Sequence, residues 1–232
     1  MLKERDEEWL RINYPTLTPG GDGVAGTLEF RAAYKHDTNR FVILGDQVAD
    51  EYGAVTLTGS FDVQIQERRD KSTSRLPALH VKGIETIPER HFNQRDQSAC
   101  LCSPLEEWQF LEPEFRFVLY LEQLVIPFLY GQVFYSSHRR WPWSEYAHGA
   151  TGILEAYSKV CDQARAEECV RQLRQDACWS RIQSALRQKS YIKGHTPCFC
   201  SRMDQIRRCH PDALQGALRL QRDLTALGIS IG

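Results

Sequence analysis

The chain has 232 residues, of which 42% are apolar and 25% charged, and its formal net charge is −1 at pH 7. This composition is ordinary for a folded soluble protein of one large domain, or of a medium domain with an appendage. The near-zero charge excludes a protein drawn to nucleic acid or to acidic membranes by its overall field. No apolar run approaches the roughly 20 residues that span a bilayer. Because the charged residues 1–10 also lack an apolar signal core, we expect a cytoplasmic protein.

The first part of the chain predicts a helix followed by a sheet. Residues 5–14 read as a short amphipathic helix that Pro15 ends. Strand-like alternation follows and is clearest at Phe61, Val63 and Ile65, which would be buried between polar neighbours. The predicted strands are 26–34, 40–44, 55–66 and 76–81. Because no helix separates them, we expect an antiparallel meander.

The second part predicts helices after a long loop. Residues 85–104 show neither strand nor helix periodicity, and loops of this length are usually functional or disordered. The apolar stripe over 114–135 predicts a core helix packed on the sheet, which Pro127 should kink. Further helices are predicted at 145–160, with Ser144 as the N-cap, at 162–187 and at 211–227. The predicted fold class is α+β.

Two cysteines, Cys100 and Cys102, lie in the long loop, downstream of His91 and Asn93. A short polar loop that ends in a cysteine is a plausible nucleophile site, because the thiolate is the reactive form and needs access to its substrate. Two alternatives remain at this point. The pair could be half of a metal site, or both thiols could be small buried hydrophobic groups, as cysteine side chains often are.

A second cluster near the C-terminus has the spacing C-x-C-x8-C-H and comprises Cys198, Cys200, Cys209 and His210. Three thiolates and an imidazole suit tetrahedral zinc, and four protein ligands leave no position open for a substrate. We therefore expect a structural zinc ion that supplies much of the folding free energy of its segment. The remaining cysteines are expected to be packing residues: Cys161, Cys169 and Cys178.

The order of helix, antiparallel meander, H-x-N loop, C-L and helices resembles that of ubiquitin-conjugating enzymes, whose domain is called the UBC fold. The matching residues are His91-Phe92-Asn93 and Cys100-Leu101, with Phe92 in place of the family's proline. The stretch W-P-W-S-E-Y-A-H-G at 141–149, followed by G-I-L-E-A-Y at 152–157, resembles a signature of bacterial relatives. Those relatives belong to antiphage operons of the cyclic-oligonucleotide signalling type (CBASS), beside a cGAS-like nucleotidyltransferase.

This resemblance implies a UBC-like conjugating domain at 1–160 and a helical C-terminal region at 161–232. The implied activity is acyl transfer in antiphage defence. Cys100 would carry the C-terminus of the nucleotidyltransferase as a thioester and pass it to an amine of an unknown acceptor protein. Asn93 would donate to the oxyanion or brace the loop, and His91 would organise the loop. The family's usual interval from histidine to cysteine is ten residues; Cys100 gives nine and Cys102 eleven, so Cys102 stays open as the nucleophile, although Leu101 favours Cys100.

The segment 193–210 resembles the SEC-C motif, usually C-P-C-G-S-G-x5-C-H, with Ser201-Arg202-Met203 in place of Gly-Ser-Gly. The motif implies a zinc-bound appendage that binds protein. We expect no nucleic-acid or membrane partner, because the arginines of this segment lack interleaved aromatic residues and usually form a solvated face: Arg202, Arg207 and Arg208. Two other functions stay open. One is a non-catalytic UBC-like module that recruits a partner through the zinc segment. The other is a cysteine hydrolase that pairs Cys100 with His91 or His148; His148 could equally be structural.

Overall fold

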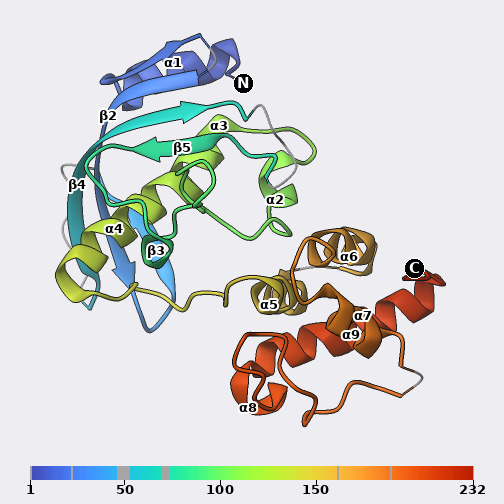
Figure 1. Ribbon diagram of the computed structural model, residues 1–232. Coiled ribbons are helices and arrows are strands. Elements are labelled where there is room, and N and C mark those ends of the chain that lie inside the picture. Colours follow the sequence, from blue (N-terminus) through green and yellow to red (C-terminus); the bar gives the residue numbers. More distant parts are fainter. Residues whose placement is uncertain are drawn as a thin grey trace. The chain divides into compact units, whose positions relative to one another are not determined.

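The computed structural model describes residues 2–21, 23–45, 53–68, 74–160, 162–188 and 190–231. The chain divides into two compact units (Figure 1): unit 1 comprises 1–102 and 109–144, and unit 2 comprises 103–108 and 145–232. The described residues have the predicted α+β class, with a five-stranded antiparallel sheet and helices. Residues 145–160, which we expected at the end of the first domain, belong to unit 2 because their helix packs along the last helix of the chain.

The sheet of unit 1 is built around one long strand, β2. Its strands are β1 (Leu17–Gly20), β2 (Gly23–Lys35), β3 (Arg40–Ile43), β4 (Val55–Gln66) and β5 (Ala78–Val81). Strand β2 pairs with β4 along one edge and with β1 and then β3 along the other, while β5 pairs with the far edge of β4. The four predicted strands are confirmed. Strand β1 was missed because Pro19 and Gly20 within it indicate a turn.

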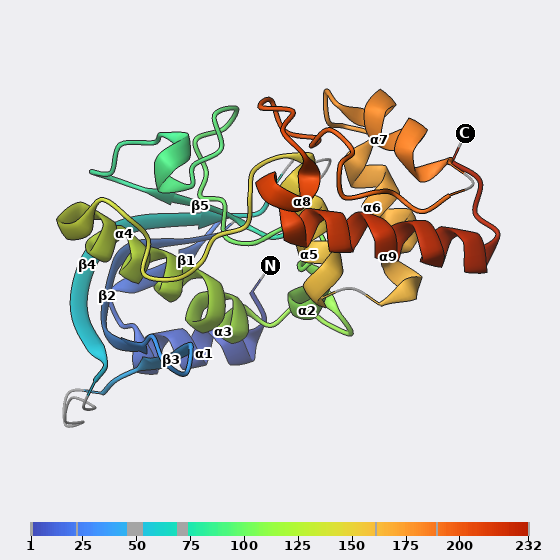
Figure 2. The ribbon, with the colours of Figure 1, turned by 90° about the horizontal axis from the view of Figure 1, so that it is seen from below.

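The helices of this part of the chain are α1 (Glu4–Asn13), the short η1 (Pro88–Arg90), α2 (Trp108–Leu111), α3 (Phe117–Tyr120), the π-helical η2 (Leu121–Val125) and α4 (Ile126–His138). The last three run on from one another and lie against the sheet (Figure 2), where they share a core with Leu28 and Ile65. Pro127, where we expected a kink, lies in the first turn of α4. A π-helical turn precedes the proline, and such a turn accommodates the missing N–H and the bulk of the ring.

This continuous helix also corrects the expectation that the chain has no long apolar run. Residues 117–138 form one 22-residue helix that is long and apolar enough to cross a membrane, although 67% of its most apolar window is buried inside the protein. A core helix of a soluble protein passes the same test, so the helix alone is weak evidence for a membrane span. Its buried face contacts the sheet, which accounts for the apolar sequence.

Unit 2 is helical. Its elements are α5 (Ala150–Val160), η3 (Gln163–Arg165), α6 (Ala166–Leu173), α7 (Trp179–Leu186), α8 (Ile206–Cys209) and α9 (Pro211–Leu227). Helices α5 and α9 approach closely, since a Cβ added at Gly216 would lie 1.8 Å from the carbonyl oxygen of Leu154. The segment 103–108 supplies Leu105, only 1% exposed, to the same core. Cys169 and Cys178 are packing residues of this core as expected, whereas Cys161 lies outside the described residues.

Two helix predictions in unit 2 were wrong at their boundaries. Helix α5 begins at Ala150, so Ser144 is not its N-cap. The cap comes instead from Asp176, whose Oδ2 accepts a 2.7 Å hydrogen bond from the Ala150 N–H. The same carboxylate accepts a 2.9 Å bond from the Cys178 N–H, in the turn that separates α6 from α7. The single helix predicted at 162–187 is therefore broken into two.

Candidate functional site

The chain between His91 and Cys100 forms a small hairpin on the outer edge of β5, which we call the Cys100 hairpin (residues 91–100). Phe92 and Ala99 pair as an antiparallel bridge, and the Ala99 N–H donates to the Leu79 carbonyl at 2.8 Å. The Cys100 N–H donates to the His91 carbonyl at 2.7 Å. Part of the segment predicted as irregular is thus a hairpin that is hydrogen-bonded to β5, and the backbone of Cys100 is tied to that of His91.

The two candidate nucleophiles differ in their surroundings. Cys100 is exposed, directly after the buried Ala99, whereas Cys102 is half-buried against the core of unit 1. A nucleophile that receives an acyl group from another protein needs an accessible sulfur. On this ground Cys100 is the better candidate.

His91 and Asn93 both hold the hairpin. His91 has a left-handed backbone, with φ 55°, and its ring packs edge-on against Trp141 with centroids 4.6 Å apart. The Asn93 amide donates through Nδ2 to the carbonyl oxygen of Ser98 at 3.2 Å and to the Ser98 hydroxyl at 3.1 Å. Of the two roles expected for Asn93, the structure contains the bracing one.

Three residues that the sequence analysis missed complete this support. The side chain of Arg68, 8% exposed, contacts the Asp96 carboxylate at 2.5 Å and donates to the Ser98 hydroxyl at 2.9 Å. Asp96 in turn accepts from the Ser98 N–H and hydroxyl. Burial alone would raise the pKa of Asp96, but the hydrogen bonds from Ser98 and Arg68 outweigh it, so the pKa is lowered. An aspartate two residues before a serine is a common sequence signal for a turn of this kind, in which the carboxylate accepts from the backbone N–H two residues on. Nothing in the sequence indicates that Arg68 would contact this turn.

His148 and its neighbours shape the start of α5. His148 is exposed and belongs to unit 2, whereas His91 and Cys100 belong to unit 1. Its carbonyl accepts a 3.0 Å bond from the Thr151 hydroxyl. A Cβ at Gly152 would lie 1.7 Å from the carbonyl oxygen of Ala147, and the Ala147 N–H donates to Glu155 at 2.7 Å. The H-G-x-x-G part of the sequence thus builds a tight turn before the helix.

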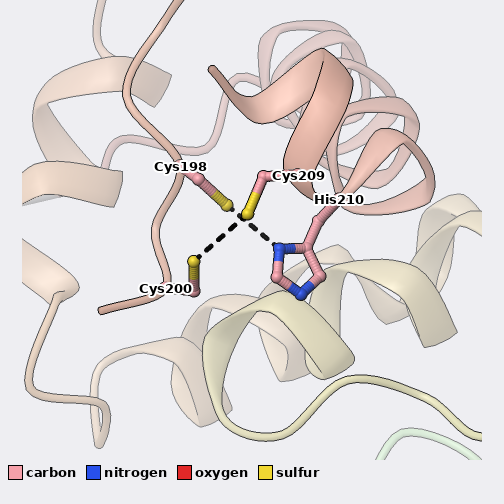
Figure 3. A group of neighbouring side chains, drawn as sticks. All are labelled: Cys198, Cys200, Cys209 and His210. Carbon is pink, nitrogen blue, oxygen red and sulfur yellow. Dashed lines mark hydrogen bonds between the residues drawn. The ribbon is translucent and has the colours of Figure 1, made fainter. Parts of the chain in front are cut away.

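Figure 3 shows the second cluster, in which Cys198, Cys200, Cys209 and His210 turn their donor atoms toward one another. Cys198 and Cys200 lie in a turn closed by the Pro197–Gln205 bridge and by a 2.7 Å bond from the Cys198 N–H to the Asp204 carbonyl. Cys209 ends α8, and His210 directly precedes α9. All four donor atoms lie within 4.8 Å of one another.

These distances fit a tetrahedral metal. Zinc bonds of about 2.3 Å to sulfur and about 2.0 Å to nitrogen place two sulfurs about 3.8 Å apart and a sulfur and nitrogen about 3.5 Å apart. The Cys200 and Cys209 sulfurs are 3.5 Å apart, and the Cys198 sulfur is 3.2 Å from His210 Nδ1. Burial raises the pKa of the Cys198 thiol. At Cys200 hydrogen bonds, first that from the Cys209 side chain, outweigh burial and lower the pKa.

The turn that follows Cys200 contains Ser201-Arg202-Met203, where the SEC-C motif usually has Gly-Ser-Gly. Met203, which stands at the position of the second glycine, has φ 57° and is 53% exposed. The left-handed backbone that a glycine adopts without strain is therefore kept here by a residue with a Cβ. Met203 thus takes, with a side chain, a backbone conformation that favours glycine.

No protein-family model, no curated protein and no solved structure matches this chain.

Proposed function

We propose that this protein is a cysteine-dependent acyl carrier of the ubiquitin-conjugating type that acts in CBASS antiphage defence. The observation that carries the proposal is the exposed Cys100 at the end of a hairpin whose backbone is bonded to His91 and braced by Asn93. A fixed backbone and an accessible sulfur are what a thiol needs to receive and release an acyl group repeatedly. The sequence resemblance in the H-x-N and C-L residues supports the same reaction class.

The reaction has two steps. The Cys100 thiolate attacks an activated C-terminal carbonyl, a thioester on a separate activating enzyme, and the enzyme's thiolate leaves. An amine of the acceptor then attacks the new thioester, which forms an amide, releases the Cys100 thiolate and gives up the proton of the amine to solvent. We propose the C-terminus of a cGAS-like nucleotidyltransferase as the acyl group. We propose a separate activating enzyme as the source of this thioester, because we recognise no glycine-rich nucleotide loop in the sequence; the alternative is a linkage that forms another way.

Intact mass spectrometry after co-expression with the nucleotidyltransferase and an activating enzyme tests this. We expect an adduct on the wild-type chain that is lost in Cys100→Ala and retained in the matched control Cys102→Ala. Hydroxylamine should release it, since it cleaves thioesters, whereas a disulfide would resist hydroxylamine and yield to dithiothreitol. An adduct that survives Cys100→Ala, or that only dithiothreitol removes, would disprove the thioester on Cys100.

We also propose that the C-terminal cluster binds one structural zinc ion and that unit 2 serves to bind a protein partner. Three sulfurs and one imidazole nitrogen within 4.8 Å of one another are a donor set that suits zinc, which supports the metal site. Metal analysis of the purified chain should give one zinc per chain. Cys198→Ala should abolish it, while Cys178→Ala, which removes a buried thiol of the same unit outside the cluster, should retain it. Equal zinc content in both variants would contradict the assignment.

A non-catalytic binding module is the second candidate. The observation that favours it is that the two hydrogen bonds of Asn93 Nδ2 both go to Ser98, so Asn93 braces the loop in this structure. The two candidates differ in the effect of one substitution. A binding module keeps its partner and its defence phenotype in Cys100→Ala, whereas an acyl carrier keeps the partner and loses the phenotype.

A further inference from the structure

Ser98 is the centre of the Cys100 hairpin, and each of its two oxygen acceptors has two donors. The residue is fully buried. Its carbonyl oxygen accepts from the Asn93 backbone N–H at 2.8 Å and from Asn93 Nδ2 at 3.2 Å. Its hydroxyl oxygen accepts from Asn93 Nδ2 at 3.1 Å and from Arg68 at 2.9 Å, and donates to Asp96 at 2.8 Å.

The second donor on each Ser98 oxygen bears on the role of Asn93, because a side-chain amide has only two N–H donors to share among its partners. In the structure Asn93 Nδ2 makes two hydrogen bonds and both go to Ser98, which occupies the donor capacity that an oxyanion beside Cys100 would need. The amide must leave Ser98 before it can act there. Leaving a buried acceptor unsatisfied usually costs about 1–3 kcal/mol. Here the backbone N–H of Asn93 and the guanidinium of Arg68 remain behind, so each Ser98 oxygen keeps a donor.

Arg68 is anchored independently of Asn93. Its Nε donates to the Leu76 carbonyl at 3.1 Å and its Nη1 contacts Asp96 at 2.5 Å, while Nη2 holds Ser98. The side chain is nearly buried, so these three contacts fix its orientation. A rotation of the Asn93 amide therefore leaves the position of Arg68 unchanged.

We propose that Arg68 is a positioning residue for acyl transfer, which keeps Ser98 satisfied and so lets the Asn93 amide turn to the oxyanion formed at the Cys100 thioester. This inference rests on the proposed function and adds to it a residue and a role. Arg68 contacts no reacting atom and acts through Asn93. A purely structural arginine would instead support the hairpin whether or not Asn93 is present.

A double-mutant cycle separates the two roles, since residues that act through one another have non-additive effects. The probe is a glycyl thioester of mercaptoethanesulfonate, which loads Cys100 by thiol exchange without an activating enzyme. The measured rate is discharge of the loaded Cys100 to free lysine, followed by peptide mass spectrometry. The variants are Asn93→Ala, Arg68→Gln and the double variant, with Arg116→Gln, an exposed arginine of the same unit, as the matched control.

We expect discharge to fall about 100-fold in Asn93→Ala, the usual loss for one oxyanion donor. The discharge rate of Arg68→Gln should fall about tenfold, and the double variant should discharge no more slowly than Asn93→Ala alone. Arg68→Lys retains the charge and should recover part of the rate, and it replaces Arg68→Gln in the cycle if that variant does not fold. Arg116→Gln should discharge at the wild-type rate.

Multiplicative losses in the double variant, or wild-type discharge in Arg68→Gln, would overturn the positioning role and leave the proposed function standing. A wild-type Cys100 thioester that reacts with lysine no faster than a thioester on the urea-unfolded chain would overturn both. The two failures are thus told apart by the wild-type protein alone.

Discussion

The close approach of α5 and α9 predicts that Gly216→Ala destabilises the protein, although the same change usually stabilises an exposed helix. Replacing Gly216 with alanine adds a methyl group 1.8 Å from the Leu154 carbonyl oxygen and 2.6 Å from its carbon. In an exposed helix the same change would stabilise by about 1 kcal/mol, because alanine has the higher helix propensity. Gly216 is buried, so the backbone of α5 must move instead.

The magnitude follows from the displacement that is needed. A carbon–oxygen contact of at least about 3.2 Å requires the two helices to separate locally by roughly 1.4 Å, which opens the core that they share. That core contains fully buried side chains on both helices, among them Leu154, Tyr157 and Leu220. Overpacking of this kind costs about 1–3 kcal/mol, and backbone overlap places Gly216→Ala at the upper end, near 3 kcal/mol.

Thermal unfolding measures the loss of stability as a fall in Tm. Hydrogen exchange of peptides from α5 and α9 shows whether the loss is located in these two helices. For a domain of under about 100 residues, 3 kcal/mol corresponds to a fall in Tm of roughly 12–24 °C. The matched control is Gln215→Ala, an exposed position one residue earlier on α9, which should stay within about 0.5 kcal/mol of wild type. A Gly216→Ala protein as stable as wild type, or more stable, would refute the packing described here.

Two further predictions concern unit 2. Asp176→Asn should destabilise by about 1–2 kcal/mol, since Asp176 caps Ala150 and bonds Cys178. Hydrogen bonds, first those from Cys178, outweigh burial and lower the pKa of Asp176, so its contribution is complete above the unfolded pKa and is lost as pH falls through the folded value. Urea unfolding between pH 7 and pH 3 should therefore show the gap between wild type and variant narrowing with acid; a gap independent of pH would contradict this. Met203→Gly should raise Tm by relieving up to about 1 kcal/mol of left-handed strain, and a lower Tm with zinc still bound would count against it.

Much of the fold follows from local patterns. Alternation in 55–66 predicted β4 at its observed bounds, and the apolar spacing in 211–227 did the same for α9. The gathering of Cys198, Cys200, Cys209 and His210 was also predictable, because these residues are close in sequence and have the spacing of metal ligands. In each case the interactions that define the feature are encoded within a short stretch of chain.

The errors have the opposite cause. Ser144 is a good N-cap in isolation, yet α5 begins six residues later because the capping carboxylate is Asp176, from the turn after α6. Arg68 is an ordinary charged residue in sequence and becomes the buried anchor of the Cys100 hairpin only through contacts with a loop about 30 residues away. Contacts between distant parts of the chain leave no local periodicity from which to predict them.

Residues 103–108 lie between two parts of unit 1 in sequence but belong to unit 2, and this has a consequence for biosynthesis. Leu105 is made directly after Cys100 and Cys102, but the helices that bury it follow residue 145. During translation this leucine therefore has no hydrophobic surroundings until the last third of the chain has left the ribosome. The hydrogen bonds that tie the Cys100 hairpin to β5 and to Arg68 join only residues made earlier, so on a ribosome stalled before that point the hairpin could be in place while the segment directly after Cys102 would still lack the core that buries Leu105.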